Sequence, residues 1–158
     1  MFIIISCYNN HKHIHIKVKE TMKKLYIFAF VYLVLGLVFG VFYREFTVMN
    51  GYNGETQLSV MHTHALVLGT LFLCLVLVLH KLFNINKIKG YSIWFIVYNV
   101  GFIGLLLTLL IRGMGQVLSW ELNGFNHIAG LFHTILGTAL IWFFIILGKS
   151  LKEEFKLK

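Results

Sequence analysis

The chain has 158 residues, of which 58% are hydrophobic and only 13% are charged, and its net charge is +8. A soluble domain usually has about a quarter of its residues charged, and a domain of this size has too little interior to hide so much apolar surface from water. The composition therefore excludes an ordinary soluble domain and favours an integral membrane protein.

We expect residues 1–21 to be a non-native or disordered leader, with translation starting at Met22. The apolar beginning of this leader is too short for a secretory signal, and no small-residue cleavage site follows it. Met22 and the two lysines after it lead directly into the first long apolar run. Three alternating histidines in the leader could suggest a metal-binding tract, but we assign no function to His11, His13 and His15.

Four apolar runs follow that lack charged side chains for about the 20 residues a helix needs to cross roughly 30 Å of hydrocarbon. They cover approximately residues 25–43, 60–79, 91–111 and 125–147. Helices satisfy every backbone donor and acceptor internally, as lipid requires, and no alternating strand pattern is present. The sequence therefore predicts an all-α, four-helix transmembrane bundle over residues 22–148, followed by a basic cytoplasmic tail over residues 149–158.

The distribution of basic residues predicts the orientation of the bundle. From Met22 onward, nine lysines precede the first run, separate the second from the third, or follow the fourth, whereas only Arg44 and Arg112 lie on the other side. Positively charged flanks stay in the cytoplasm, so both ends of the bundle are predicted to be cytoplasmic (N-in/C-in) in a multi-pass protein of the cell (cytoplasmic) membrane. Because membrane orientation explains the net charge, the lipid bilayer is the expected partner and nucleic acid is not.

Ionisable side chains inside a bilayer cost several kcal/mol unless they are paired or hydrated, and they often mark function. In the predicted topology six of them gather at the outer side: Arg44, His62, His64, Arg112, His127 and His133. At a helical rise of about 1.5 Å per residue, His133 lies deepest, about 12 Å into its span. His80, beside Lys81 at the cytoplasmic boundary, is expected to be solvated instead.

Helical periodicity ranks the four outer histidines. His62 shares its face with the small residues Ala65 and Gly69, which would let a neighbouring helix approach closely. His133 lies on one stripe with two glycines, Gly130 and Gly137, and we expect it to face inward. We therefore rank His62 and His133 above His64 and His127 as cofactor or metal ligands.

Two interpretations of these residues remain open. In the first, the histidines ligate a b-type haem or a metal, because imidazoles from facing helices commonly hold haem iron, and Arg44 and Arg112 pair with the propionates. In the second, the histidines hydrogen-bond between helices and the arginines anchor at the headgroups. For His133 the two interpretations are about equally supported. For His64 and His127 the second interpretation, hydrogen bonding between helices, is favoured. A zinc or copper site is less expected, because no closely spaced ligand set is present.

Other residues have structural interpretations. Gly36 and Gly40 form a small-xxx-small motif that predicts close packing of the first span against a neighbour. Asn99 and Thr108 are expected to form hydrogen bonds across helices. Three aromatic residues are expected in the interfacial belt: Tyr91, Trp94 and Trp120.

Residues 22–147 resemble a family of small bacterial four-helix membrane proteins that has no assigned activity. The matching segments begin at Gly40 (Gly-Val-Phe-Tyr-Arg-Glu-Phe), Met61 (Met-His-Thr-His-Ala-Leu-Val-Leu-Gly) and Ala129 (Ala-Gly-Leu-Phe-His). A weaker resemblance is to subunit I of haem–copper oxidases, in which a similar helix entry supplies a haem ligand at the position of His62. The chain has too few helices, and too few of the histidines of that copper site, for terminal oxidase activity to be expected.

The predicted function is a membrane protein with an outer-side histidine cluster that binds haem b for electron transfer or for handling a small ligand. One alternative is a non-catalytic accessory or assembly subunit whose histidines and arginines contact a membrane partner. Another is a small transporter formed by homo-oligomerisation, with the histidines as a proton relay. No reaction is assigned to the chain.

Overall fold

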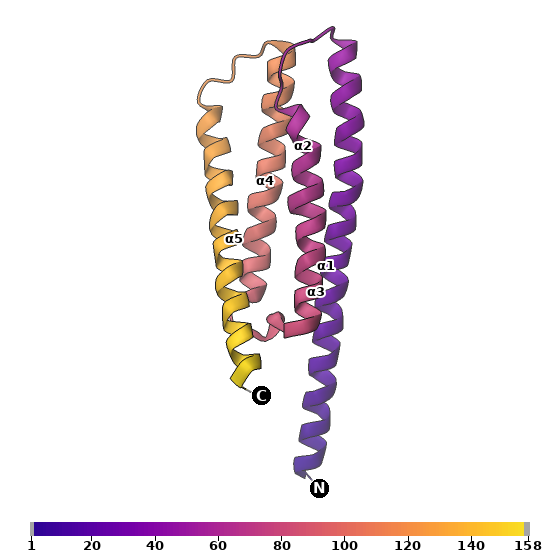
Figure 1. The fold of residues 1–158 in the computed structure, drawn as a ribbon, viewed down its shortest axis with the longest axis vertical. Helices are drawn as coiled ribbons and strands as arrows, with labels where there is room; N and C mark the ends of the chain where they lie inside the picture. The colour runs from indigo at the N-terminus through magenta and orange to yellow at the C-terminus, as the bar shows by residue number, and fades with distance from the viewer. Residues whose placement is uncertain (1, 157–158) are drawn as a thin grey trace.

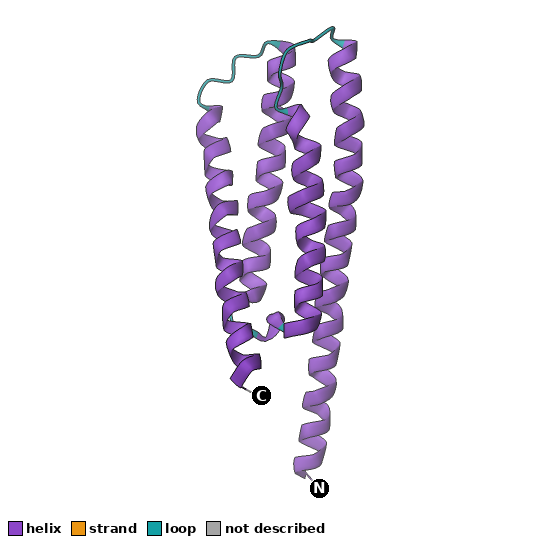
Figure 2. Cartoon of the chain, in the orientation of Figure 1, coloured by secondary structure: helices purple, strands orange, loops and turns teal. Residues whose placement is uncertain are grey.

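The computed structural model describes the backbone of residues 2–156 and the side chains from Val18 onward. The described chain is a bundle of long helices joined by short loops (Figures 1 and 2). The second span is built from three consecutive pieces, and its connection to the next span contains one turn of 3₁₀-helix. The elements are α1 (Phe2–Met49), α2 (Leu58–His64), the π-helix η1 (Ala65–Leu71), α3 (Phe72–Phe83), the 3₁₀-helix η2 (Ile85–Lys87), α4 (Tyr91–Leu118) and α5 (Phe125–Lys156).

All four predicted spans are confirmed as helices that are long and apolar enough to cross a membrane. These helical stretches are Val18–Met49, Leu58–Phe83, Tyr91–Leu118 and Phe125–Lys156. Each helix covers its whole apolar run and continues beyond at least one end of it. This is possible because helical hydrogen bonding continues into polar flanks that lie outside hydrocarbon. The backbone of residues 2–21 is also helical and continuous with the first span. Translation from Met22 stays a prediction, and the side chains of residues 1–17, with their three histidines, lie outside the described part of the chain.

The two described ends of the chain and the connection between α3 and α4 all lie at one end of the bundle (Figure 1). We call this the lysine-rich end; it carries Lys23, Lys24, Lys81, Lys87, Lys89 and Lys149. We call the opposite end, where α1 joins α2 and α4 joins α5, the arginine end, after Arg44 and Arg112. This arrangement places the lysines together, as the N-in/C-in prediction requires. The orientation in the membrane itself stays a prediction.

Helix α4 is the centre of the bundle. Over half of its most apolar stretch, 56%, is buried within the protein, against 22% for each of the other three spans. Helix α5 packs along α4, while α1 packs along the second span and α2 also contacts α4. The interior between these helices is filled by aromatic rings, among them the fully buried Trp94, Tyr98 and Phe102.

Small residues let α1 approach the second span, as the sequence predicted. A Cβ atom on Gly36 would lie 2.7 Å from the Leu66 side chain, and one on Gly40 would lie 3.8 Å from the Cβ of His62. From the other side, a Cβ on Gly69 would lie 2.6 Å from the Cβ of Tyr32. The two helices therefore meet through a seam of glycines on both partners.

The structure corrects two expectations about polar and aromatic side chains. Tyr91 and Trp94 are not in an interfacial belt: they are 4% and 0% exposed, and the Trp94 indole N–H donates to the Ala139 carbonyl oxygen at 2.8 Å. Only Trp120, 49% exposed, suits the belt. Asn99 does bond across helices, accepting the Tyr32 hydroxyl at 2.6 Å. Thr108 does not, because its hydroxyl donates to the Leu105 carbonyl of its own helix.

Candidate functional site

His62 lies on α2 and faces α1, as its small-residue stripe predicted. Gly40 on α1 leaves the space that the half-buried imidazole occupies. The Nε2 atom lies 3.3 Å from the hydroxyl of the neighbouring Thr63, whereas the Nδ1 atom is buried and has no hydrogen-bond partner among the described residues. His62 therefore has one ring nitrogen whose bonding capacity is unused within the chain.

A π-helical segment, η1, begins directly after His64. A π-helix is defined by backbone hydrogen bonds that reach five residues back, against four in an α-helix. In η1 the Phe72 N–H donates to the Val67 carbonyl in this way. The segment is supported from outside, because the Tyr98 hydroxyl on α4 donates to the Leu68 carbonyl. Segments of this kind are frequent at functional sites. Nothing in the apolar pattern of residues 60–79 distinguishes this segment from an ordinary α-helix, so the π-helix cannot be predicted from the sequence.

His64 bonds to its own helix. Its Nδ1–H donates to the Val60 carbonyl oxygen at 2.8 Å, and the residue is half-buried. This local bond fixes the ring orientation and leaves Nε2 as the atom that could accept a hydrogen bond or bind a metal.

His127 and His133 lie on α5, and the expectation that His133 faces inward is wrong. Both side chains are exposed, and His133 Nδ1–H donates to the Ala129 carbonyl of its own helix at 2.8 Å. A Cβ added to Gly130 or to Gly137 would meet nothing within 4 Å, so the glycine stripe beside His133 is open as well. The stripe predicted correctly which residues share a side of the helix. It could not predict the direction of that side, because in a membrane helix both the protein-facing and the lipid-facing sides are apolar.

The side of α5 that does pack on α4 carries buried residues at helical spacing: Ala129, Leu136, Ala139, Phe143 and Ile146. At about 100° per residue, His133 lies roughly 100° around the helix from the middle of this buried stripe. His62 faces α1 and His133 lies on the flank of α5, so the two imidazoles face different neighbours. The described residues contain no group of three or more His, Cys, Asp or Glu side chains that could hold a metal ion.

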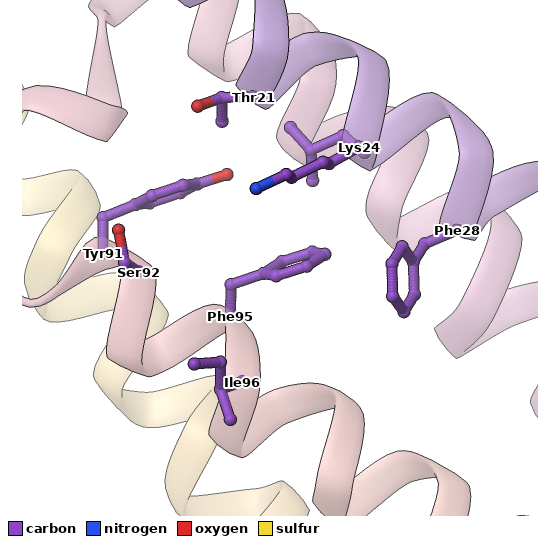
Figure 3. Close-up of a pocket in the computed structure, with 8 residues that line it drawn as sticks. Thr21, Lys24, Phe28, Tyr91, Ser92, Phe95 and Ile96 are labelled. Atoms are coloured by element: carbon purple, nitrogen blue, oxygen red, sulfur yellow. The ribbon is translucent and has the colours of Figure 1, made fainter. Parts of the chain in front are cut away.

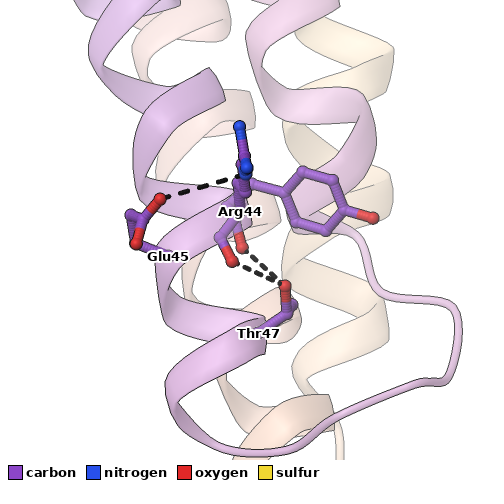
Figure 4. Close-up of polar contacts among 4 residues, drawn as sticks. Arg44, Glu45 and Thr47 are labelled. Carbon is purple, nitrogen blue, oxygen red and sulfur yellow. Dashed lines mark hydrogen bonds and ion pairs between the residues drawn. The ribbon is translucent and has the colours of Figure 1, made fainter.

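Arg44 and Arg112 lie at the arginine end in different surroundings. The Arg44 side chain is 82% exposed and forms an ion pair with the adjacent Glu45, with 4.0 Å between Nε and Oε1 (Figure 4). Nearby, the Thr47 hydroxyl donates to the carbonyl oxygens of Tyr43 and Arg44, which closes the last turns of α1. Arg112 is half-buried on α4.

The loop between α1 and α2 folds back over α4 at this end. The buried Thr56 hydroxyl donates to the Gly113 carbonyl at 2.9 Å, and the Gln57 N–H donates to the Gln116 side-chain oxygen at 2.7 Å. Gln116 thus anchors the loop, a role that its position one turn after Arg112 did not reveal. Between the loop and the helices lies a polar hollow of about 640 Å³ that reaches Tyr43 and Gln116.

At the lysine-rich end, the expectation that His80 is solvated is wrong. His80 is 0% exposed, and its ring stacks with Tyr91 at 6.2 Å between centroids. The ring lies near the backbone of Val18, yet neither ring nitrogen has a hydrogen-bond partner within the described part of the chain. His80 is buried because α1 continues beyond its apolar run and covers the imidazole ring. A shorter helix would leave this ring in water.

Comparison with known proteins places this architecture in a family. The model of the protein family of unknown function DUF2871 matches residues 22–150, a range that includes all four apolar runs. No curated protein and no solved structure matches the chain significantly. The resemblance to haem–copper oxidases therefore gains no support and stays a prediction. The likeness carried by the Tyr-Arg-Glu-Phe and His-Thr-His segments is confirmed: the chain is a multi-pass membrane protein that belongs to the DUF2871 family of unknown function.

Proposed function

We propose that this protein is a subunit of a membrane assembly and that it self-associates through the open side of α5, which carries Gly130, His133 and Gly137. The observation that carries the proposal is the exposure of His133, about 12 Å along its span by the helical rise. An imidazole facing lipid at that depth costs free energy that a protein neighbour removes. A side of α5 that carries such a group is therefore better suited to another helix than to lipid.

The open side of α5 fits a second copy of the same helix. Gly130 and Gly137 meet nothing within 4 Å, so another backbone has room to approach them. The hydroxyls of Thr134 and Thr138, on the same side, already donate to carbonyls of their own helix at 2.9 and 2.8 Å. Small residues with satisfied polar atoms are the common composition of close helix pairs in membranes, and two-fold dimers are the commonest assemblies.

A second candidate function, binding of haem b, is favoured by the unused imidazole nitrogens. In a two-fold dimer His133 would approach His133 of the other copy, and two facing imidazoles are a donor set for haem iron. His62, with its unpartnered Nδ1, is the other candidate ligand. His64, His127, Arg44 and Arg112 lie toward the same end and would serve as neighbours of the group rather than as its first ligands. Such a cofactor would supply electron transfer or small-ligand handling.

Cysteine cross-linking in membranes tests the assembly. In a background with Cys7 and Cys74 replaced by alanine, Gly137→Cys should form a disulfide-linked dimer on mild oxidation. The matched control is Val34→Cys, which is 44% exposed on α1 and should remain monomeric. Equal cross-linking at both positions, or none at Gly137→Cys, would contradict self-association through α5.

A reduced-minus-oxidised absorption spectrum of protein purified from haem-replete cells tests the second candidate. We expect a b-type α-band that is lost in His133→Ala and retained in His127→Ala. A colourless preparation that still cross-links through α5 would leave the subunit proposal standing and exclude the haem proposal.

A further inference from the structure

A cavity of about 380 Å³ lies between α1 and α4 at the lysine-rich end of the bundle. It is distinct from the four histidines toward the arginine end, which are His62, His64, His127 and His133, and His80 borders it only through the Tyr91 ring. Its polar lining comes from Thr21 and Lys24 on α1 and from Tyr91 and Ser92 on α4 (Figure 3). Because Lys24 and Ser92 are exposed, the cavity reaches the molecular surface. Its volume is within the range of ordinary ligand pockets.

Tyr91 points its hydroxyl into this cavity (Figure 3). The residue is only 4% exposed, and its hydroxyl oxygen is buried without a hydrogen-bond partner among the described residues. The ring cannot easily turn away, because it packs against Trp94 at 5.5 Å and against His80 at 6.2 Å between centroids. A buried hydroxyl held in this way is costly unless something in the cavity bonds to it.

Lys24 adds a positive charge on the facing wall, with its ammonium group directed across the cavity toward Tyr91 (Figure 3). The single ion pair among the described side chains is Arg44–Glu45, so Glu20, one turn before Lys24 on α1, does not neutralise this ammonium within 4.0 Å. A lysine ammonium beside a hydroxyl donor is a donor set for a phosphate oxygen.

The rest of the cavity wall is apolar and lies one helical turn, roughly 6 Å, deeper in the membrane. Phe28 on α1 and Phe95 on α4 meet there edge to face at 5.2 Å between centroids. Ile96, also in the lining, is 62% exposed and continues the wall onto the surface that faces lipid. Polar donors at the membrane boundary followed by an apolar track match the two parts of a phospholipid.

We propose that this cavity binds an anionic phospholipid of the adjacent leaflet. Its phosphate would accept hydrogen bonds from the Tyr91 hydroxyl and the Lys24 ammonium, and one acyl chain would lie along Phe95 and Ile96. The net negative charge of such a lipid complements a bundle end that carries several further lysines. A soluble phosphate would use the same donors but would leave the apolar track empty.

Lipid titration followed by native mass spectrometry of the full chain tests this site. Both lipids offer the phosphate, but the choline ammonium cancels the headgroup charge and is repelled by the lysines of this bundle end, so phosphatidylglycerol should bind about tenfold more tightly than phosphatidylcholine with the same acyl chains. Lys24→Gln should abolish most of that preference, and Tyr91→Phe should weaken binding of phosphatidylglycerol while keeping the ring contacts. Lys23→Gln, at an adjacent exposed lysine outside the lining, is the matched control and should bind like the wild type.

Three results would overturn the proposal. Equal affinity for the two lipids would show that the cavity does not recognise an anion. An equal loss in Lys23→Gln and Lys24→Gln would show that only the general surface charge matters. If inorganic phosphate displaced phosphatidylglycerol at concentrations similar to those at which the lipid binds, the site would be assigned to free phosphate. Unchanged thermal unfolding of Tyr91→Phe in lipid-free detergent would confirm that this variant is folded.

Discussion

Individual polar side chains hold this apolar bundle together because hydrocarbon offers them no water. The Tyr32 hydroxyl donates to Asn99 on α4, the Tyr98 hydroxyl to the Leu68 carbonyl in η1, and the Trp94 indole to the Ala139 carbonyl on α5. Each bond joins two different spans. Since a polar atom left alone in a lipid-like interior is costly, these three residues favour one pairing of helices over others.

Tyr32→Phe should destabilise the fold by about 1 kcal/mol, because it leaves the Asn99 side-chain oxygen without its donor. Tyr26→Phe is the control, since Tyr26 lies on the same helix but is 61% exposed. Unfolding by denaturant in detergent micelles would measure both variants. Equal stability of the two would mean that the Tyr32–Asn99 bond contributes nothing net.

His80 is the opposite case, a buried polar residue whose ring nitrogens have no partner in the described chain. His80→Leu keeps most of the side-chain volume and removes two unsatisfied polar atoms, so we expect stability to be unchanged or higher. The same unfolding measurement applies. A loss of more than about 1 kcal/mol would show that the imidazole bonds to a group such as a bound water.

At the scale of the helix, glycines decide which surfaces can meet. A Cβ on Gly113 of α4 would lie 2.6 Å from the backbone nitrogen of Leu58, which cannot move without shifting α2. A Cβ on Gly130 of α5 would meet nothing within 4 Å. Two glycines in equally apolar helices therefore have different roles, one inside the bundle and one on its outer surface.

Gly113→Ala should lower the free energy of unfolding by about 1–3 kcal/mol, the usual cost of overpacking a closed contact. Gly130→Ala should leave the stability of the monomer unchanged. Thermal unfolding in detergent at a concentration that keeps the protein monomeric would compare the two. If Gly130→Ala proved as damaging as Gly113→Ala, α5 would have to be packed differently from the structure described above.

For the whole molecule, the lysines at one end predict the orientation in the membrane. In the background without native cysteines, Asn53→Cys at the arginine end should react with a membrane-impermeant maleimide in intact cells. Lys87→Cys should react only after the cells are permeabilised, because lysine-rich flanks stay in the cytoplasm. Both positions are exposed, so the reverse labelling pattern would invert the predicted topology.

The sequence by itself determined the four spans and which residues share each side of a helix. Length and charge depletion are local properties, and a 3.6-residue period places His62 with Gly69 or His133 with Gly137 without knowledge of neighbours. The close contact of α1 with the second span was also predictable, because Gly36 and Gly40 are spaced by one turn.

Only the tertiary structure decided which way each side faces. Lipid and protein interior are equally apolar, so hydrophobic periodicity cannot tell a core stripe from a lipid-facing one, and the inward placement of His133 is wrong for this reason. The interfacial placement of Trp94 is wrong for another reason: residue type and closeness to a span end do not show that a neighbouring helix covers the ring. The burial of His80 depends on α1 extending over it from residues far away in the chain. The π-helix after His64 depends likewise on Tyr98, a side chain that reaches it only when α4 packs against the second span.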